Sequence, residues 1–400
     1  MRRLLTLLLI SITLFCFTSC EDSYETENLN PETRTVLVYF PWSGNNDDNK
    51  GASLYYLLKE NLDSIKSAVG KMTGLGNNRV LVFVSESNSE AYMYEVLYRR
   101  GKAEVTTLHH YGENFETLPD ITTTDGLRTI LNQAYNVTQS NKWQMIIGCH
   151  GLGWPEKDYS PKARAFGGGS NATKMDVDDF AAAVTTSNIG KFEYILFDDC
   201  YMAGVETVHY LKDATHYFIA STSEIMARGM PYNIAWQYLV GEPNYAGIIN
   251  SFSSYYNSQT YGTNNSGCLS VVDCTQIDNL TAVMKEINAK GYELTTQQRN
   301  SLQYLDGFRD HAFYDIRDYV KTLTNNNSAL MSQFDAALTR LVPYTYTTPY
   351  IFSAFMNGTY GQFFKIKDTD TYSGISTSDP SIDTYIVNTR EQTSWWKATH

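Results

Sequence analysis

The sequence predicts an α/β fold in which a mostly parallel sheet carries helices on both faces, followed by a more helical C-terminal part. Apolar runs rich in Val, Ile, Leu and Phe alternate with amphipathic stretches, as expected for buried parallel strands joined by helices. Two of these runs end in a reactive side chain, IIGCHGLGW at His150 and ILFDDCYMAG at Cys200. With 400 residues, of which 42% are hydrophobic, the chain is long enough to bury a substantial core.

The N-terminus has the pattern of a secretory signal. Two arginines precede an apolar stretch over residues 4–17, and small residues then lead to Cys20. The pattern resembles the lipoprotein signals of Bacteroidetes, in which the cysteine is lipidated and becomes the first residue; ordinary secretion is the alternative. We expect a signal peptide over 1–20, a polar tether over 21–33, and a protein anchored in the cell envelope through lipid on Cys20 or secreted.

The net charge and the cysteine content argue against two classes of protein, nucleic-acid-binding proteins and disulfide-rich proteins. The net charge of -12 argues against a nucleic-acid partner, because binding phosphates needs a basic face. The four cysteines beyond residue 20 are too few for a disulfide framework in a chain of this length. We expect Cys149 to be a core residue, and Cys268 and Cys274, which bracket an apolar run, to be buried thiols; a disulfide between that pair is the alternative.

The elements follow one another in a regular order. Strands are expected over residues 35–40, 79–84, 143–149, 192–197, 216–220 and 268–273, with a hairpin near 91–98 and 103–108 and a β pair near 350–366. Helices are expected over 52–69, 123–138, 176–187 and 201–212, the second capped by Thr123 or Thr124. This order predicts a first domain over 34–240 and, over 241–400, a C-terminal α+β subdomain packed on it.

The two reactive residues predict a shared site. Parallel strands end at one edge of a sheet, so His150 and Cys200 are expected to meet as base and nucleophile. A thiol with a pKa near about 8.5 is mostly protonated at neutral pH. His150 would take its proton, and a helix starting directly after Cys200 would stabilise the thiolate. The N–H groups of Gly151 and Cys200 would then bind the oxyanion of an acyl-transfer reaction.

Acidic and basic residues near these strand ends have two interpretations each. Asp198 shares a strand face with Cys200 and would bind a substrate Lys or Arg, whereas the alternative for Asp198 and Asp199 is capping of the next helix. The long polar loop between Trp154 and Asp176 is of a length that is usually functional. It carries four basic residues, Lys157, Lys162, Arg164 and Lys174.

CHGLGW and FDDCYMAG resemble the His and Cys motifs of the clostripain family of cysteine peptidases, which share the caspase-like fold with gingipains and legumains. The likeness covers residues 35–240 and includes the segment IASTSEIMARGMPYN. It implies a caspase-like fold and an endopeptidase that cleaves proteins or peptides after Arg or Lys, with His150 and Cys200 as its dyad and Asp198 as the selecting residue. A second carboxylate is expected after the strand at 216–220, where Glu224 is the acidic candidate.

The resemblance has further implications. Many family members cut their own loop between His and Cys, which here is the 155–175 loop, although an ordinary solvated loop fits its basic residues equally well. The chemistry requires no cofactor, but such enzymes can depend on calcium. Three acidic side chains would then be calcium ligands, or would simply mark a helix N-terminus: Asp176, Asp178 and Asp179. Asp199 replaces the family's commoner small residue.

A rival hypothesis is a catalytically silent surface lipoprotein that binds peptides, glycans or a partner protein. The 30 Tyr, 18 Phe and 6 Trp residues suit glycan stacking, but aromatic residues also fill ordinary cores. The presence of both dyad residues favours the enzyme, since a binding module has no reason to retain them.

Overall fold

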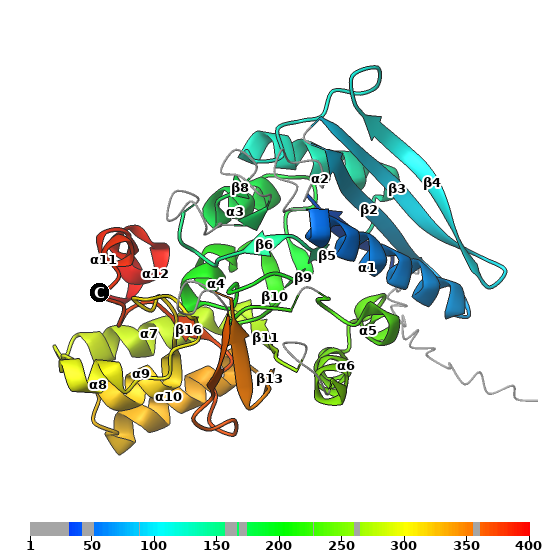
Figure 1. Cartoon of the computed structure of the whole chain (residues 1–400). Coiled ribbons are helices and arrows are strands. Elements are labelled where there is room, and N and C mark those ends of the chain that lie inside the picture. Colours follow the sequence, from blue (N-terminus) through cyan, green and yellow to red (C-terminus); the bar gives the residue numbers. More distant parts are fainter. Residues whose placement is uncertain are drawn as a thin grey trace, which may run out of the picture. The chain divides into compact units, whose positions relative to one another are not determined.

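The computed structural model describes residues 32–41, 52–87, 89–156, 166–167, 174–226, 228–259, 265–354 and 361–400. Within them, nine strands form one sheet in the order β13-β11-β10-β9-β5-β1-β2-β3-β4 (Figure 1). Neighbouring strands from β2 through β10 in this order are parallel, and two antiparallel strands extend each edge. The mostly parallel sheet predicted from the sequence is confirmed.

The strands of the sheet coincide closely with the expected apolar runs. Their bounds are β1 Arg34–Phe40, β2 Asn78–Ser87, β3 Glu90–Arg99, β4 Lys102–Tyr111, β5 Lys142–Ile147, β9 Phe192–Phe197, β10 Thr215–Ala220, β11 Cys268–Asp273 and β13 Tyr344–Thr347. The smaller strands are β6 His150–Gly151, β7 Phe166–Gly167, β8 Lys174–Met175, β12 Tyr314–Asp315, β14 Tyr350–Ser353, β15 Gln362–Lys365 and β16 Ser376–Thr377. The expected edge hairpin is β3–β4, and the expected late β pair is β14–β15.

The connections place helices on both faces of the sheet. The crossover from β1 to β2 runs in one direction along the sheet, and those from β5 to β9 and β10 run in the other. Because such crossovers are right-handed, α1 (Ala52–Lys71) covers one face, whereas α3 (Val177–Thr185) and α4 (Val205–Leu211) cover the opposite face. α5 (Tyr232–Leu239) packs beside α1, and α2 (Thr124–Thr138) packs beside α3 (Figure 1).

Local sequence signals explain the helices that were correctly expected. In α1, one face is apolar and buried through Leu58, Leu62, Ile65 and Val69. Thr123 caps α2, since its hydroxyl accepts the Gly126 N–H at 3.1 Å. Both helices therefore follow from an amphipathic pattern and, for α2, from a capping residue.

The later part of the chain adds to the same sheet and surrounds it with further helices. These are α6 Tyr245–Ser258, α7 Ile277–Asn288, α8 Thr296–Asn300, α9 Ile316–Leu323, α10 Ser328–Leu341, α11 Thr384–Thr389 and α12 Ser394–Thr399. α12 packs on both α4 and α7, and α10 packs on α7, so the second helical layer continues from α4. From Glu32 to His400 the residues cluster as one compact unit.

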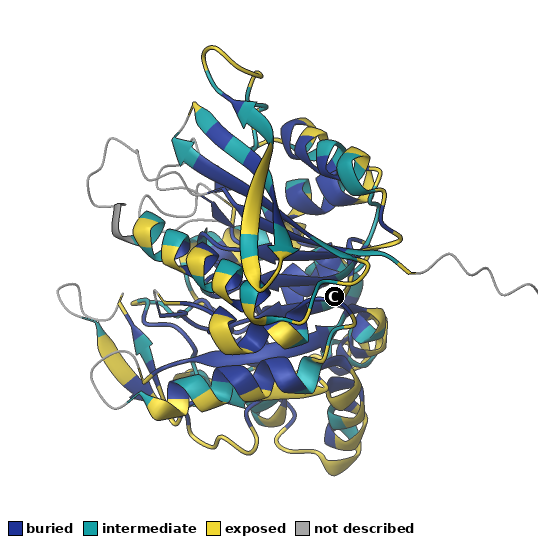
Figure 2. Ribbon diagram, turned by 90° about the vertical axis from the view of Figure 1, so that its right-hand side faces the viewer, coloured by how far each residue is buried: buried dark blue, intermediate teal, exposed yellow. Residues whose placement is uncertain are grey.

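Burial is greatest at the centre of the sheet. The strands β1, β5 and β9 bury nearly every side chain on both faces, whereas the outermost strand β4 is largely exposed (Figure 2). Cys268 and Cys274 are buried free thiols, as expected, and are not joined by a disulfide. Among the described residues, no helix is long and apolar enough to cross a membrane. Cys20 and the segments at 1–20 and 21–31 lie outside the described residues.

Candidate active site

The two reactive segments leave neighbouring strands at the same edge of the sheet. β5 and β9 are parallel, with Ile147 opposite Phe197. The Asp198 N–H donates to the Ile147 carbonyl oxygen at 2.8 Å, which extends this pairing by one residue. His150 and Cys200 follow three residues after these strand ends, and both are half-buried.

Gly151 brings the two segments into direct contact. A side chain at this position would place its Cβ atom 2.6 Å from the carbonyl oxygen of Cys200 and 2.8 Å from the Cβ atom of Asp199. Only glycine fits such a close approach of two backbones. His150 and Gly151 form the short strand β6, which pairs with β7, and this pairing fixes the segment on its other side.

The thiol of Cys200 faces the carbonyl oxygen of Ile225 at 3.8 Å. Burial raises its pKa far above the ordinary value, and the negative charge of Glu224 adds to this rise. The unaided thiol is therefore protonated at neutral pH. A base must remove the proton before the sulfur can act as a nucleophile.

The expectation that a helix begins directly after Cys200 is wrong. α4 begins at Val205, with Gly204 as its N-cap and no side-chain capping bond. Tyr201 instead adopts a left-handed backbone conformation with φ 61°, and its N–H donates to the carbonyl oxygen of Ser223. This hydrogen bond holds Tyr201 against the segment after β10, so the chain is not helical at this residue. Neither Asp198 nor Asp199 caps this helix, and Cys200 lies four residues before its N-cap.

Asp198, two residues before Cys200, is buried and 7% exposed. Its carboxylate accepts the Met230 N–H at 2.9 and 3.0 Å and the Tyr232 hydroxyl at 2.9 Å. Gly229, with φ 62°, passes so close that a Cβ atom would lie 2.4 Å from Asp198 Oδ2. Burial raises the pKa of Asp198 to about 6, against the bonds from Met230 and Tyr232, which lower it.

Glu224 is also buried and lies on the segment that follows β10. Its carboxylate accepts hydrogen bonds from the Tyr201 hydroxyl at 2.8 Å, the Ser353 hydroxyl at 2.5 Å and the Ala354 N–H at 2.9 Å. Burial raises its pKa despite these donors. Glu224 therefore connects the residue after Cys200 to the end of β14.

Cys149 and Asp199 form a contact that sequence reasoning missed. The carboxyl group of Asp199 accepts the Cys149 N–H at 2.6 Å, and the Cys149 thiol donates to the second oxygen at 3.2 Å. Burial raises the pKa of Cys149 well above its ordinary value, so this thiol stays protonated and serves as a donor. Burial also raises the pKa of Asp199 to about 8. The one visible signal was an acidic residue at 199 where a small one is common.

The basic and acidic residues of the long loop divide into separate groups. Lys157, Lys162 and Arg164 lie outside the described residues, whereas Lys174 is 1% exposed in β8. The expectation that Lys174 belongs to a solvated loop is wrong, because pairing of β8 with β7 draws it into the interior. Asp176 is the N-cap of α3, and Asp178 and Asp179 occupy its first turn. The described residues contain no group of three or more His, Cys, Asp or Glu side chains able to hold a metal ion.

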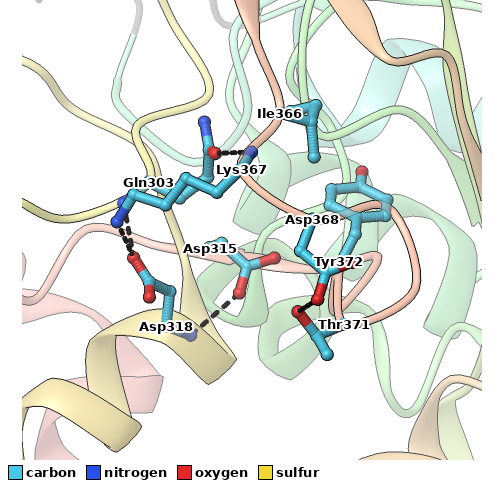
Figure 3. A pocket seen from close by; sticks show the side chains of 8 residues that line it. All are labelled: Gln303, Asp315, Asp318, Ile366, Lys367, Asp368, Thr371 and Tyr372. Atoms are coloured by element: carbon cyan, nitrogen blue, oxygen red, sulfur yellow. Dashed lines mark hydrogen bonds and ion pairs between the residues drawn. The ribbon is translucent and has the colours of Figure 1, made fainter.

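A small pocket lies elsewhere and contains neither reactive residue. Its volume is about 30 Å³, and its lining includes Gln303, Asp318 and Lys367 (Figure 3). Asp318 accepts both the Gln303 N–H and the Lys367 ammonium at 2.6 Å, so this carboxylate already has partners within the chain. The pocket is the size of a single water molecule, and the strand ends remain the candidate active site.

Comparisons with known proteins agree with this geometry. The model of the clostripain family matches residues 45–343. Iotapain, a secreted C11 cysteine protease from Bacteroides thetaiotaomicron, is 36% identical with a TM-score of 0.80, covering 92% of this chain and 99% of its own. A clostripain from the same organism, solved with the peptide inhibitor BTN-VLTK-AOMK, is 41% identical with a TM-score of 0.53, covering 59% of this chain and 99% of its own.

A more distant structure supports the fold alone. An inactive zymogen of a C11 protease from Parabacteroides distasonis is 23% identical with a TM-score of 0.74, and covers 92% of this chain and 98% of its own. Among curated proteins, none matches this chain. Because the family model spans most of the sequence and iotapain aligns over nearly all of it, the chain belongs to the clostripain family of cysteine peptidases.

Proposed function

We propose that the protein is an endopeptidase in which Cys200 is the nucleophile and His150 the base. His150 takes the thiol proton while the sulfur forms a bond to the substrate carbonyl carbon. The N–H groups of Gly151 and Cys200 stabilise the oxyanion. The carbon–nitrogen bond then breaks, and His150 gives its proton to the leaving amine. Water, deprotonated by His150, hydrolyses the thioester and restores the thiol.

The observation that carries this proposal is the packing of Gly151 against the backbone of Cys200. Gly151, which follows His150, lies against the carbonyl group of Cys200, and this close approach supports the pairing of the two side chains. The raised pKa of Cys200 adds the chemical requirement for a base at this point. No cofactor enters these steps, since an imidazole and a thiol suffice for acyl transfer. A calcium requirement stays a prediction of the family resemblance, to be tested by adding calcium to a chelated preparation.

The substrate side chain before the cleaved bond is proposed to be Arg or Lys. Asp198 supplies a buried carboxylate two residues before the nucleophile, and Glu224 supplies another on the segment opposite. A basic substrate group would compensate the cost of ionising Asp198 in a buried site. The related clostripain was solved with the inhibitor BTN-VLTK-AOMK, whose last peptide letter denotes lysine.

Fluorogenic peptides that differ only in Arg, Lys or Ala before the cleaved bond test the activity and its selectivity together. We expect turnover after Arg and Lys and little after Ala. Preferred cleavage after Ala would refute Asp198 as the selecting residue. No cleavage of any peptide, with Cys200 inert to iodoacetamide, would refute the dyad.

Self-activation in the 155–175 loop is proposed at Lys157, Lys162 or Arg164. Lys174 is excluded in the described conformation, because a buried strand residue cannot enter an active site. Mass spectrometry of purified protein tests this step. Wild type is expected to be cut after one of the three residues, and Cys200→Ala is expected to stay intact. An active wild-type enzyme that remains one uncut chain would contradict the proposal.

The protein is proposed to reach the cell envelope through lipid on Cys20, with ordinary secretion as the alternative. The relative iotapain is described as secreted. Metabolic labelling with a fatty acid distinguishes the two routes. We expect label on the wild type and release of unlabelled Cys20→Ala into the medium.

A further inference from the structure

One buried contact joins the two reactive segments by a side chain rather than by the backbone. Cys149 comes directly before His150, and Asp199 comes directly before Cys200. The carboxyl group of Asp199 accepts both the N–H and the thiol of Cys149, at 2.6 and 3.2 Å. Asp199 is 1% exposed and Cys149 is 5% exposed, so water does not compete for these bonds.

We propose that Asp199 is a positioning residue of the peptidase, which acts through Cys149 to hold His150 at a fixed place relative to Cys200. The proposal rests on the proposed function, because it assigns a task within that dyad. The hydrogen bonds of the Asp199 carboxyl group go to Cys149, one residue away from the base. Each of the two bonded residues is the immediate chain neighbour of one member of the dyad, so this side chain ties the two dyad segments together.

The sheet cannot perform this task by itself. Backbone pairing of β5 with β9 extends to Ile147 and Phe197, and the Asp198 N–H adds one last bond to Ile147. Beyond this point, the Asp199 carboxyl group holds the two segments together by accepting the Cys149 N–H. Backbone pairing ends there because the two segments separate. Gly151 packs on the Cβ atom of the same Asp199, so the segment that carries His150 touches this residue both before and after the base.

The bond to the amide is the stronger part of the contact. A backbone N–H that loses its acceptor inside a protein moves until it finds another, which displaces the residues attached to it. Asp199→Ala removes both bonds. Asp199→Asn keeps an oxygen for the Cys149 N–H and offers an N–H to the sulfur. Cys149→Ala removes only the bond from the thiol.

The experiment measures kcat and KM for a basic peptide, together with the pH dependence of Cys200 alkylation by iodoacetamide, mapped by mass spectrometry. For Asp199→Ala we expect kcat to fall about 10²-fold with KM nearly unchanged, since misplacement by about 1 Å has this effect. The pH profile of alkylation should move toward that of His150→Ala. Asp199→Asn should recover most of kcat, and Cys149→Ala should lose less than Asp199→Ala.

Glu95→Gln is the matched control, because Glu95 is a buried carboxylate held by Arg79 near the sheet edge, away from the strand ends. It should leave kcat and the alkylation profile unchanged. A folded Asp199→Ala with wild-type kcat and alkylation profile would overturn the proposal. If Asp199→Ala does not fold, Asp199→Leu decides, because it fills a similar space but offers the Cys149 N–H no acceptor, and wild-type values in it overturn the proposal as well.

Failure of the proposed function gives a different result. In that case the wild-type protein itself hydrolyses no peptide, and its Cys200 is not alkylated faster than in His150→Ala. An active wild type with an equally active Asp199→Ala refutes only the positioning role.

Discussion

Gly151 packs against the carbonyl oxygen of Cys200 so closely that an added Cβ atom would lie 2.6 Å from it. This contact brings together two segments that are 50 residues apart in the sequence. The position of His150 relative to the thiol therefore depends on residue 151 having no side chain.

Gly151→Ala should therefore reduce catalysis more than it reduces stability. The added carbon meets backbone atoms that cannot rotate away, so the two segments must separate. We expect kcat to fall on the order of 10²-fold, because catalysis is sensitive to displacements of about 1 Å. Steady-state kinetics with a basic peptide measure the effect. Gly112→Ala is the matched control, since its Cβ atom would meet nothing closer than 3.7 Å.

Asp198→Asn should change selectivity. Loss of the charge removes the partner of a substrate guanidinium or ammonium group, so kcat/KM for Arg and Lys peptides should fall about 10²-fold or more. The value for an Ala peptide should change little, which serves as the internal control. Equal losses for all three peptides would show that Asp198 supports the structure of the site and does not read the substrate.

Glu224→Gln separates a selecting role from a structural one. The amide oxygen can still accept bonds from Tyr201, Ser353 and Ala354, so the local structure should persist while the charge is lost. We expect a smaller loss of kcat/KM for basic peptides than in Asp198→Asn, with an unchanged value for Ala. Unchanged kinetics for every peptide would remove Glu224 from substrate binding.

The raised pKa of Asp198 predicts a pH dependence of both stability and substrate binding. The pKa is about 6 in the folded protein and 3.8 without perturbation, so the folded state holds its proton to a higher pH. The resulting stability is fully present below pH 3.8 and is lost as the pH rises through about 6, on the order of 3 kcal/mol in total.

Denaturant unfolding between pH 4 and pH 7 measures this effect. The difference in unfolding free energy between Asp198→Asn and wild type should shift in favour of the variant as the pH rises. Binding of a basic peptide needs the ionised carboxylate, so KM for Lys peptides should fall over the same range. A KM that does not change with pH in this range would contradict the role of Asp198 in binding.

The central strands could be predicted from the sequence because they are short apolar runs, whose composition reflects burial on both faces. The start of α4 could not be predicted, because residues 201–203 have helix-compatible side chains. Their conformation is set by hydrogen bonds to Ser223 and Ser221, which lie some 20 residues later. Local propensity does not contain such a partner.

The candidate site shows the same limit. His150 and Cys200 were found because each ends a strand, and strand ends meet by topology. The contact of Asp199 with Cys149 depends on the register of β5 and β9, and the burial of Lys174 depends on β8 pairing with β7. Both contacts depend on how distant segments pair in the folded protein, which local sequence patterns do not determine. A capping carboxylate and a solvated lysine were the more ordinary expectations for these residue types.

The most direct test of the central claim is the site and rate of covalent labelling by a peptide acyloxymethyl ketone that ends in lysine. Labelled protein is digested and the modified cysteine is identified by mass spectrometry, in wild type and in His150→Ala. We expect one adduct, on Cys200, which forms far more slowly without His150. An adduct on Cys149, or labelling of Cys200 at the same rate in both proteins, would contradict it.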